Sequence, residues 1–284
     1  MSYREPKRQE EGVVLSERVR RTAAWRTRSA TSRWRTLPDF VIIGGQRCGT
    51  TSLYAALSQH NEILPSFRKE VHFFDFHYER GTTWYRSNFP MKNAVGNRLS
   101  VEATPNYLAY PGAASRLHEV LPGGKLVVLL RDPTERTYSS WKLKVDSGHE
   151  NRAFDEAVDS EIAEMSTATS DGDPISKKSV VERMRFAHVE KSRYADHLRT
   201  WLELFDRSKV LILQSEKLFE APETYLTRVE DFLGIPKDTS ISFPHFNKTP
   251  TSSIHPPVRE RLRDYFAPQN NLLEQLTGQR FDWL

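Results

Sequence analysis

The chain contains a single cysteine, Cys48, among 284 residues. One cysteine excludes an intramolecular disulfide and any metal site built from several cysteines. The nine histidines are scattered and include no His-Glu-x-x-His pattern, so the sequence carries no zinc signature. Stability must therefore come from packing, for which 38% hydrophobic and 11% aromatic residues supply enough side chains.

Long apolar segments are missing as well. The longest runs, Phe40–Ile43 and Leu126–Leu130, are far shorter than the roughly 20 residues of a membrane-spanning helix. The N-terminus has no apolar signal-peptide core, and its glutamates disfavour a transit peptide despite the many arginines. We therefore expect a globular cytoplasmic protein without a membrane span, with import into an organelle as the alternative.

Positive charge is unevenly distributed along the chain. Residues 1–36 contain ten Lys and Arg against four Glu, whereas the remainder carries 31 basic and 33 acidic residues. We interpret residues 1–36 as a basic, flexible tail and residues 37–284 as one folded domain. A solvated arm is the simplest reading of the tail, and contact with an anionic polymer or a membrane surface is the alternative. We expect no nucleic-acid partner, and the sequence indicates no oligomeric state.

Short apolar runs alternate with amphipathic segments from residue 37 onward. Strands are expected at Phe40–Ile43, Leu99–Glu102, Lys125–Leu130 and Val210–Leu213, with helices between them. Continuous apolar strands of this kind indicate a doubly wound α/β fold, in which helices cover both faces of a parallel sheet. Ligands of such sheets bind at the carboxyl ends of the strands. The stretch Glu161–Ser179 is rich in Ser, Thr and Asp and is expected to form a long exposed loop.

A glycine loop follows the first expected strand. Gly44–Thr51 has the Gly-x4-Gly spacing of a phosphate-binding loop, but Thr50 occupies the position where a nucleotide triphosphatase has lysine. The cation lies inside the loop instead, at Arg47, and the helix that follows offers its N-terminal amides to an anion. Such a loop suits a diphosphate-like mixed anhydride better than a magnesium-bound triphosphate. An ordinary tight turn between strand and helix is the alternative.

Three motifs occur in a fixed order along the chain: Phe40–Leu53 (FVIIGGQRCGTTSL), Lys69–Asp75 (KEVHFFD) and Arg131–Arg136 (RDPTER) followed by Ser139. Together they resemble the sulfotransferases that use 3′-phosphoadenosine-5′-phosphosulfate (PAPS), in particular the branch of the heparan sulfate N- and O-sulfotransferases. The resemblance implies a P-loop-like phosphosulfate-binding loop. It also implies metal-free transfer of a sulfuryl group from PAPS to a hydroxyl or amine of a small-molecule or glycan acceptor, with release of adenosine 3′,5′-bisphosphate (PAP).

The resemblance assigns roles to individual residues. Glu70 would accept the proton of the attacking acceptor, and Arg47 would stabilise the leaving phosphate. His72 lies on the same side as Glu70 in an extended segment, so it either orients Glu70 or replaces it as the base. Arg131 and Ser139 would bind the 3′-phosphate. Further donor-binding residues are expected in the glycine loop and near the C-terminus: Cys48, Gly49, Thr50, Thr51, Ser52 and Lys248.

Two opposing effects decide whether Glu70 is ionised. Burial against the apolar residues that follow would raise its pKa, while the neighbouring cations Arg68 and Lys69 would lower it. The sequence leaves this contest open. A surface salt bridge with either cation is the alternative to a catalytic role. The aromatic residues of the same segment are expected in the core: Phe73, Phe74 and Phe76.

The sequence departs from the family pattern at several positions. Arg47 stands where family members commonly have lysine, and a guanidinium can clamp an anion but cannot donate a proton. Ala103 stands where heparan 3-O-sulfotransferases usually have another lysine, and the paired cysteines of their C-terminal loop are absent, so their acceptor specificity does not carry over. Two other functions stay open at this point: a nucleotide kinase or triphosphatase, and a polyanion-binding module that uses residues 1–36.

Overall fold

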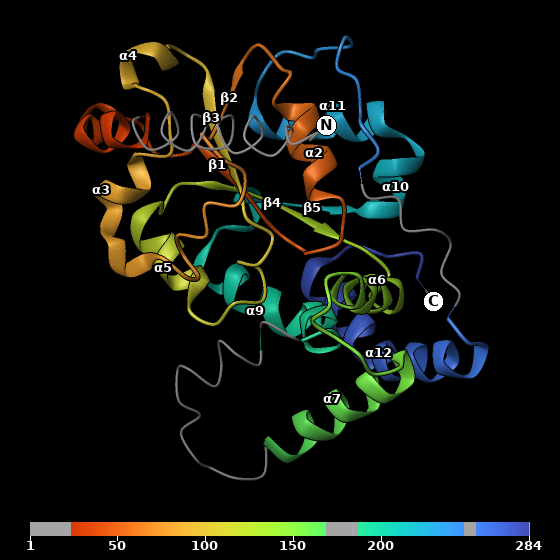
Figure 1. Cartoon of the computed structure of the whole chain (residues 1–284). Helices are drawn as coiled ribbons and strands as arrows, with labels where there is room; N and C mark the ends of the chain where they lie inside the picture. Colours follow the sequence, from red (N-terminus) through yellow and green to blue (C-terminus); the bar gives the residue numbers. More distant parts are fainter. Residues whose placement is uncertain (1–23, 169–183, 185–186, 247–253, 284) are drawn as a thin grey trace, which may run out of the picture.

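The computed structural model describes residues 24–168, 184, 187–246 and 254–283. Its centre is a parallel sheet with the strand order β2-β3-β1-β4-β5 (Figure 1). The four strands expected from the sequence are confirmed, and the short β2 is additional. The strands are β1 (Phe40–Gly44), β2 (Ile63–Pro65), β3 (Leu99–Ala103), β4 (Lys125–Leu130) and β5 (Val210–Gln214).

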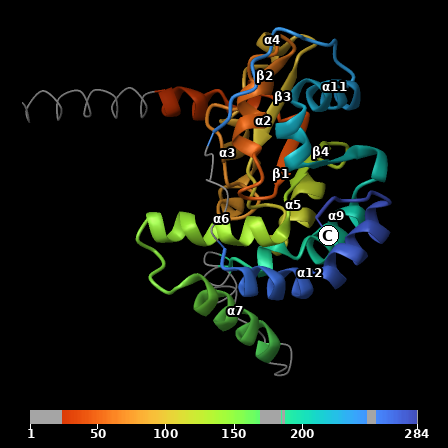
Figure 2. The same cartoon turned by 90° about the vertical axis from the view of Figure 1, so that its right-hand side faces the viewer.

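Helices cover both faces of this sheet (Figures 1 and 2), which confirms the doubly wound α/β fold. The α-helices are α2 (Thr50–Leu57), α3 (Gly81–Arg86), α4 (Lys92–Val95), α5 (Ala113–Val120), α6 (Pro133–Asp146), α7 (Phe154–Ala168), α9 (Tyr194–Leu204), α10 (Ser215–Glu220), α11 (Pro222–Leu233) and α12 (Pro256–Thr277). The described chain also contains short 3₁₀ turns: η1 (Ser32–Trp34), η2 (Tyr78–Arg80), η3 (Glu190–Ser192) and η4 (Arg207–Lys209).

The central strand β1 contributes to a hydrophobic core on each face of the sheet. Val41 and Ile43 pack into the core that includes α5 and α9, whereas Phe40 and Ile42 pack into the core that includes α2 and α11. Successive side chains of a strand point to opposite faces. Both faces are covered here, so every residue of β1 is buried and the strand is an unbroken apolar run.

The parallel strands place four chain segments at one edge of the sheet. The chain leaves β1 into the glycine loop, β3 into Thr104–Asn106, β4 into Arg131–Asp132 and β5 directly into α10. Because all five strands run in the same direction, these exits lie side by side at the carboxyl edge. The sequence predicted that a ligand would bind at this edge.

The expected loop over Glu161–Ser179 is wrong for residues 161–168, which belong to α7. This helix packs with α6 and α12 at one end of the molecule (Figure 2). Phe154, Val158, Ile162 and Met165 of α7 face the same hydrophobic cluster. They are spaced about one helical turn apart, so their apolar periodicity outweighs the polar composition of the segment. Residues 169–179 lie outside the described residues.

Residues 24–35 are attached to the chain that follows α3. Arg28 donates hydrogen bonds to the carbonyl oxygens of Ser87 (2.7 Å) and Phe89 (2.8 Å), and the buried Arg35 donates to the same Phe89 oxygen (2.8 Å). The described part of the basic N-terminal segment therefore packs on the domain. Among the described residues, none of the helices is both long and apolar enough to cross a membrane.

Candidate active site

The glycine loop joins β1 to α2 through a turn that depends on Gly49. This residue has a φ of +89° and caps the N-terminus of α2. Glycine adopts that left-handed conformation without steric cost. The turn brings the first residues of α2 to a cavity at the carboxyl edge of the sheet, where the unpaired N–H groups at a helix N-terminus favour an anion.

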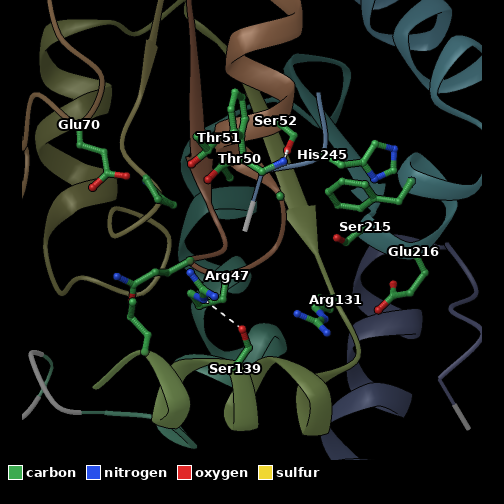
Figure 3. A pocket seen from close by; sticks show the side chains of 16 residues that line it. Arg47, Thr50, Thr51, Ser52, Glu70, Arg131, Ser139, Ser215, Glu216 and His245 are labelled. Atoms are coloured by element: carbon green, nitrogen blue, oxygen red, sulfur yellow. Dashed lines mark hydrogen bonds between the residues drawn. The ribbon is translucent and has the colours of Figure 1, made fainter. Parts of the chain in front are cut away.

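The cavity has a volume of about 520 Å³ and collects residues from widely separated parts of the chain (Figure 3). Figure 3 shows Arg47 near the centre, with Glu70 on one side, Arg131 on the other and Ser139 on the helix below. The residues predicted from the sequence that line the cavity are Arg47, Gly49, Thr50, Thr51, Ser52, Glu70, Arg131 and Ser139.

The other three predicted residues are placed differently. Cys48 is fully buried beneath the loop, with its Sγ atom 3.8 Å from the hydroxyl of Tyr194 and no surface on the cavity. Burial raises the pKa of the Cys48 thiol. His72 lies beside Glu70 and does not line the cavity. Lys248 lies outside the described residues.

Several cavity residues were not predicted from the sequence. Ser215 and Glu216 directly follow β5, so the strand-end rule that identified Arg131 could also have identified them. Phe219, on the helix that begins with Ser215, and His245 and Phe246, in the chain that follows α11, carry no comparable signal. The additional residues of the lining are Gln46, Pro105, Leu143, Ser215, Glu216, Phe219, His245 and Phe246.

Arg47 links the glycine loop to α6. Its Nε donates a hydrogen bond to Ser139 Oγ at 3.0 Å, drawn as the dashed line in Figure 3. The resemblance assigned these two residues to different ends of the nucleotide, whereas the structure brings them into contact. Burial lowers the pKa of Arg47, and the nearby guanidinium groups of Arg131 and Arg136 lower it further. This concentration of positive charge favours a bound anion.

Glu70, His72 and Asp75 form a connected set of charged side chains. The Glu70 carboxylate lies 2.5 Å from Lys69 Nζ and 3.5 Å from His72 Nε2, and His72 Nδ1 lies 2.7 Å from Asp75 Oδ2. The contact from His72 and the charge of Lys69 outweigh burial and lower the pKa of Glu70 to about 2. Burial alone would lower the pKa of His72, but Asp75 and Glu70 raise it to about 9.

Both Glu70 and His72 are therefore charged at neutral pH, and the contest that the sequence left open is decided in favour of the ionised carboxylate. An aromatic side chain covers one face of the His72 ring. Phe76 stacks on it with the ring centroids 5.1 Å apart and is 47% exposed. The expectation that Phe76 belongs to the core is wrong, because it covers His72 from the solvent side. Phe73 and Phe74 are fully buried, as expected.

Buried hydrogen bonds hold this segment in an unusual backbone conformation. Glu70 and His72 have φ values of +60° and +56°, which non-glycine residues rarely adopt. The Phe73 amide donates to the Tyr107 hydroxyl at 2.8 Å, and that hydroxyl donates to the buried carboxyl group of Glu102 at 2.6 Å. Such strain persists only where the surroundings fix it. The contacts to Tyr107 and Glu102 provide that support.

Comparison with known proteins identifies the family of the chain. A family model described as "Sulfotransferase domain" matches residues 37–256. Heparan sulfate glucosamine 3-O-sulfotransferase 6 of Homo sapiens is 28% identical over 274 residues, covering 88% of this chain and 74% of that protein. The bifunctional heparan sulfate N-deacetylase/N-sulfotransferase 3 of Homo sapiens is 31% identical over 217 residues, covering 74% of this chain and 23% of that protein.

A solved structure is similar to the whole domain. The sulfotransferase from Alicyclobacillus acidocaldarius superposes with a TM-score of 0.67 at 26% sequence identity, covering 87% of this chain and 98% of that chain. The family model spans residues 37–256, a range that includes the glycine loop, Glu70 and the Arg131–Ser139 segment. The chain therefore belongs to the sulfotransferase family and is a PAPS-dependent sulfotransferase.

Proposed function

We propose that this protein transfers the sulfuryl group of PAPS to a hydroxyl or amine of a carbohydrate, with Glu70 as the proton acceptor. The observation that supports the proposal best is the single cavity that holds both the cationic glycine loop and the ionised Glu70. In this reaction a bond forms between the acceptor oxygen or nitrogen and sulfur. The bond between sulfur and the phosphate oxygen breaks, and PAP leaves.

The positively charged side of the cavity suits the donor. Arg47 and the first amides of α2 would stabilise the negative charge that develops on the leaving phosphate. Arg131 and Ser139 would bind the 3′-phosphate. Because Ser139 is already hydrogen-bonded to Arg47, this contact would fix the Arg47 side chain beside the leaving group.

The pKa of Glu70 is low for a general base. General-base catalysis is most efficient when the pKa of the base lies near the working pH. The acceptor oxygen becomes strongly acidic only as its bond to sulfur forms. A carboxylate with a low pKa can therefore take the proton late in the displacement. His72 is already protonated and would orient Glu70, so we assign the base to Glu70 and the orienting role to His72.

A carbohydrate acceptor is supported by the relatives, whose names place their activity on heparan sulfate. One feature of this chain separates it from the heparan 3-O-sulfotransferases. Ala103 replaces a lysine that heparan 3-O-sulfotransferases usually carry, and Ala103 is fully buried on β3. A buried alanine offers no charge to an acceptor. The proposal therefore names carbohydrate as the class and leaves the sulfated position to the acceptor assay.

Ligand-dependent thermal unfolding tests the donor. At one hundred times its dissociation constant a ligand stabilises the folded state by about 2.7 kcal/mol, which for a domain of this size raises the melting temperature by roughly 5–10 °C. We expect this rise with PAP and none with ATP and magnesium. A rise with ATP and none with PAP would instead indicate a nucleotide kinase or triphosphatase.

Turnover with radiolabelled PAPS and a panel of glycosaminoglycans, including de-O-sulfated heparan sulfate, tests the base. Glu70→Gln should lower kcat by at least about 100-fold, the lower range for general-base catalysis, while the melting shift with PAP is kept. Glu79→Gln, which changes an exposed glutamate nearby, is the matched control. Normal turnover by the Glu70 variant would remove Glu70 as the base.

A further inference from the structure

Lys191 is a buried lysine next to the candidate active site that the proposed chemistry does not use. It belongs to η3, is 7% exposed and does not line the cavity. Lysine is almost never buried without a compensating partner. The two hydrogen-bond partners of its ammonium group are neutral amides, Asn106 Oδ1 at 3.1 Å and Gln46 Oε1 at 3.5 Å. Both amides belong to segments that follow strands of the sheet.

Asn106 connects Lys191 to the charged set that holds Glu70. Its Nδ2 donates to Asp75 Oδ2 at 2.9 Å, and the same oxygen lies 2.7 Å from His72 Nδ1. An ammonium group can only donate and an ionised carboxylate can only accept, so the Asn106 amide has one orientation that satisfies both. Lys191 thus determines which amide atom faces Asp75.

The backbone around Lys191 is itself held firmly against the glycine loop. The Glu161 carboxylate accepts hydrogen bonds from three successive amides at 2.8–3.0 Å: His188, Val189 and Glu190. Arg136, which is fully buried, donates to the carbonyl of His188 at 2.6 Å and to the carbonyl of Gln46 at 3.0 Å. Arg136 therefore ties the segment that carries Lys191 to the glycine loop.

We propose that Lys191 is a positioning residue: through Asn106 and Asp75 it fixes His72, and thereby Glu70, in register with the glycine loop that it contacts at Gln46. This role rests on the proposed function. The contacts place the amino group of Lys191 beside the glycine loop and connect it to the base, although Lys191 does not line the cavity. Proton abstraction and leaving-group stabilisation are then aligned by one buried side chain.

The electrostatics around Lys191 are consistent with a positioning role. Burial lowers its pKa to about 7, and the positive charges of Arg136 and Lys144 act in the same direction. The negative charges of Glu161 and Asp75 raise it. Asp75 is the partner reached through Asn106, so the connection to the base is also the one that favours the charged lysine. An anionic donor in the cavity would favour the charged form further.

Lys191→Met tests the proposal, because methionine keeps a long side chain and removes only the charge and its hydrogen bonds. Removing the buried charge relieves its desolvation cost, which offsets the two lost hydrogen bonds, so the melting temperature should change little. We expect kcat to fall about tenfold, a fraction of what general-base catalysis contributes. The shift with PAP should be kept. Lys237→Met, at an exposed lysine, is the matched control.

A second readout separates failure of this proposal from failure of the proposed function. In the absence of donor, the imidazole ¹⁵N signals of His72, assigned with His72→Gln, should change in Lys191→Met but not in Lys237→Met. A purely structural lysine would lower the melting temperature and leave kcat and these signals unchanged. That result would overturn the proposal, whether or not PAPS is the donor.

Asn106→Leu cuts the same connection at another residue. The double variant Lys191→Met/Asn106→Leu should lose no more kcat than the more impaired single variant, since residues in one network are not additive. Full additivity would overturn the connection. Should Lys191→Met not fold, Asn106→Leu decides alone, and an unchanged kcat in that variant contradicts the proposal.

Discussion

Glu70 and His72 hold each other in the charged form. The carboxylate of Glu70 and that of Asp75 flank the imidazole ring, and Lys69 approaches Glu70 from the other side. Basic and acidic side chains therefore alternate along this set, in the order Lys69, Glu70, His72 and Asp75. An acceptor hydroxyl that reaches Glu70 would meet a carboxylate already held in place by the ion pair with His72.

The raised pKa of His72 predicts a pH dependence of stability. Its pKa is about 9 in the folded chain and 6.5 in the unfolded chain. The stabilisation is therefore complete below pH 6.5 and is lost as the pH rises towards 9. After allowance for solvent screening we expect His72→Gln to cost about 1 kcal/mol at pH 6 and little above pH 9. Urea unfolding at several pH values measures this.

The control for this experiment is His149→Gln, which removes an exposed histidine. A difference between wild type and His72→Gln that stays constant from pH 6 to pH 9 would contradict the ionised pair. Urea slopes should be the same in all three proteins, because a change in slope would report a change in the surface exposed on unfolding.

At the scale of single residues, the sequence predicted the parts of the site that lie in local motifs. Arg47, Glu70 and Arg131 line one cavity. Each of them was predicted from the residues within a few positions of it in the sequence. The ionisation of Glu70 could not be predicted from the sequence, because it depends on the distances from its carboxylate to His72 and Lys69. Lys191 had no local signal, since its amide partners lie 85 and 145 positions away.

Among the elements, the turn from the glycine loop into α2 leaves little room for a side chain at Gly49. A Cβ atom at Gly49 would lie 2.7 Å from the ring of Phe219, which lines the cavity, and the residue also has a positive φ. A left-handed backbone costs an L-residue roughly 1–2 kcal/mol, and the ring contact adds to this. The N-terminus of α2 therefore packs closely against the ring of Phe219.

Gly49→Ala should lower the free energy of unfolding by about 2–3 kcal/mol and weaken PAP binding at least about tenfold. The loss of affinity is expected because Phe219 must move within the cavity. Gly278→Ala is the matched control, with a similar φ of +67° and nothing within 4 Å of the added atom. It should cost about 1 kcal/mol and leave PAP affinity unchanged. Urea unfolding and calorimetric titration measure both quantities.

At this scale the long apolar strands were predictable, whereas β2 and the second half of α7 were not. β2 is three residues long and ends at Pro65, which is too short for a periodic signal. Residues 161–168 of α7 were interpreted as part of a loop because Ser, Thr and Asp are frequent in Glu161–Ser179. The carboxylate of Glu161 binds three backbone amides near residue 190, and that long-range contact has no signature in composition.

The molecule as a whole is larger than the matched family region. The family match begins at residue 37, yet Arg28 and Arg35 reach across to the carbonyl oxygens of Ser87 and Phe89. The aromatic ring of Phe67 also lies beneath Arg28, 4.4 Å from the guanidinium carbon. Residues ahead of the family domain thus stabilise the segment between α3 and α4. The cytoplasmic location stays a prediction from the sequence.

Removing one of these contacts should affect stability but not catalysis. Arg35→Met removes a buried guanidinium that donates to the Phe89 carbonyl, so we expect a loss of about 1–2 kcal/mol and a melting temperature lower by roughly 3–6 °C. Arg33→Met, at an exposed arginine of the same turn, should change it by less than about 1 °C. Michaelis constants for PAPS should be unchanged in both. A larger effect at Arg33 than at Arg35 would contradict the attachment.

The burial of Cys48 has a practical consequence for labelling. The chain has one thiol, and it lies fully buried beneath the glycine loop with a raised pKa. Thiol reagents attack the exposed thiolate, so the folded protein resists them. A cysteine introduced anywhere on the surface would then be the single reactive position. Dyes or spin labels could be attached there, and the approach of donor and acceptor followed, without replacing Cys48.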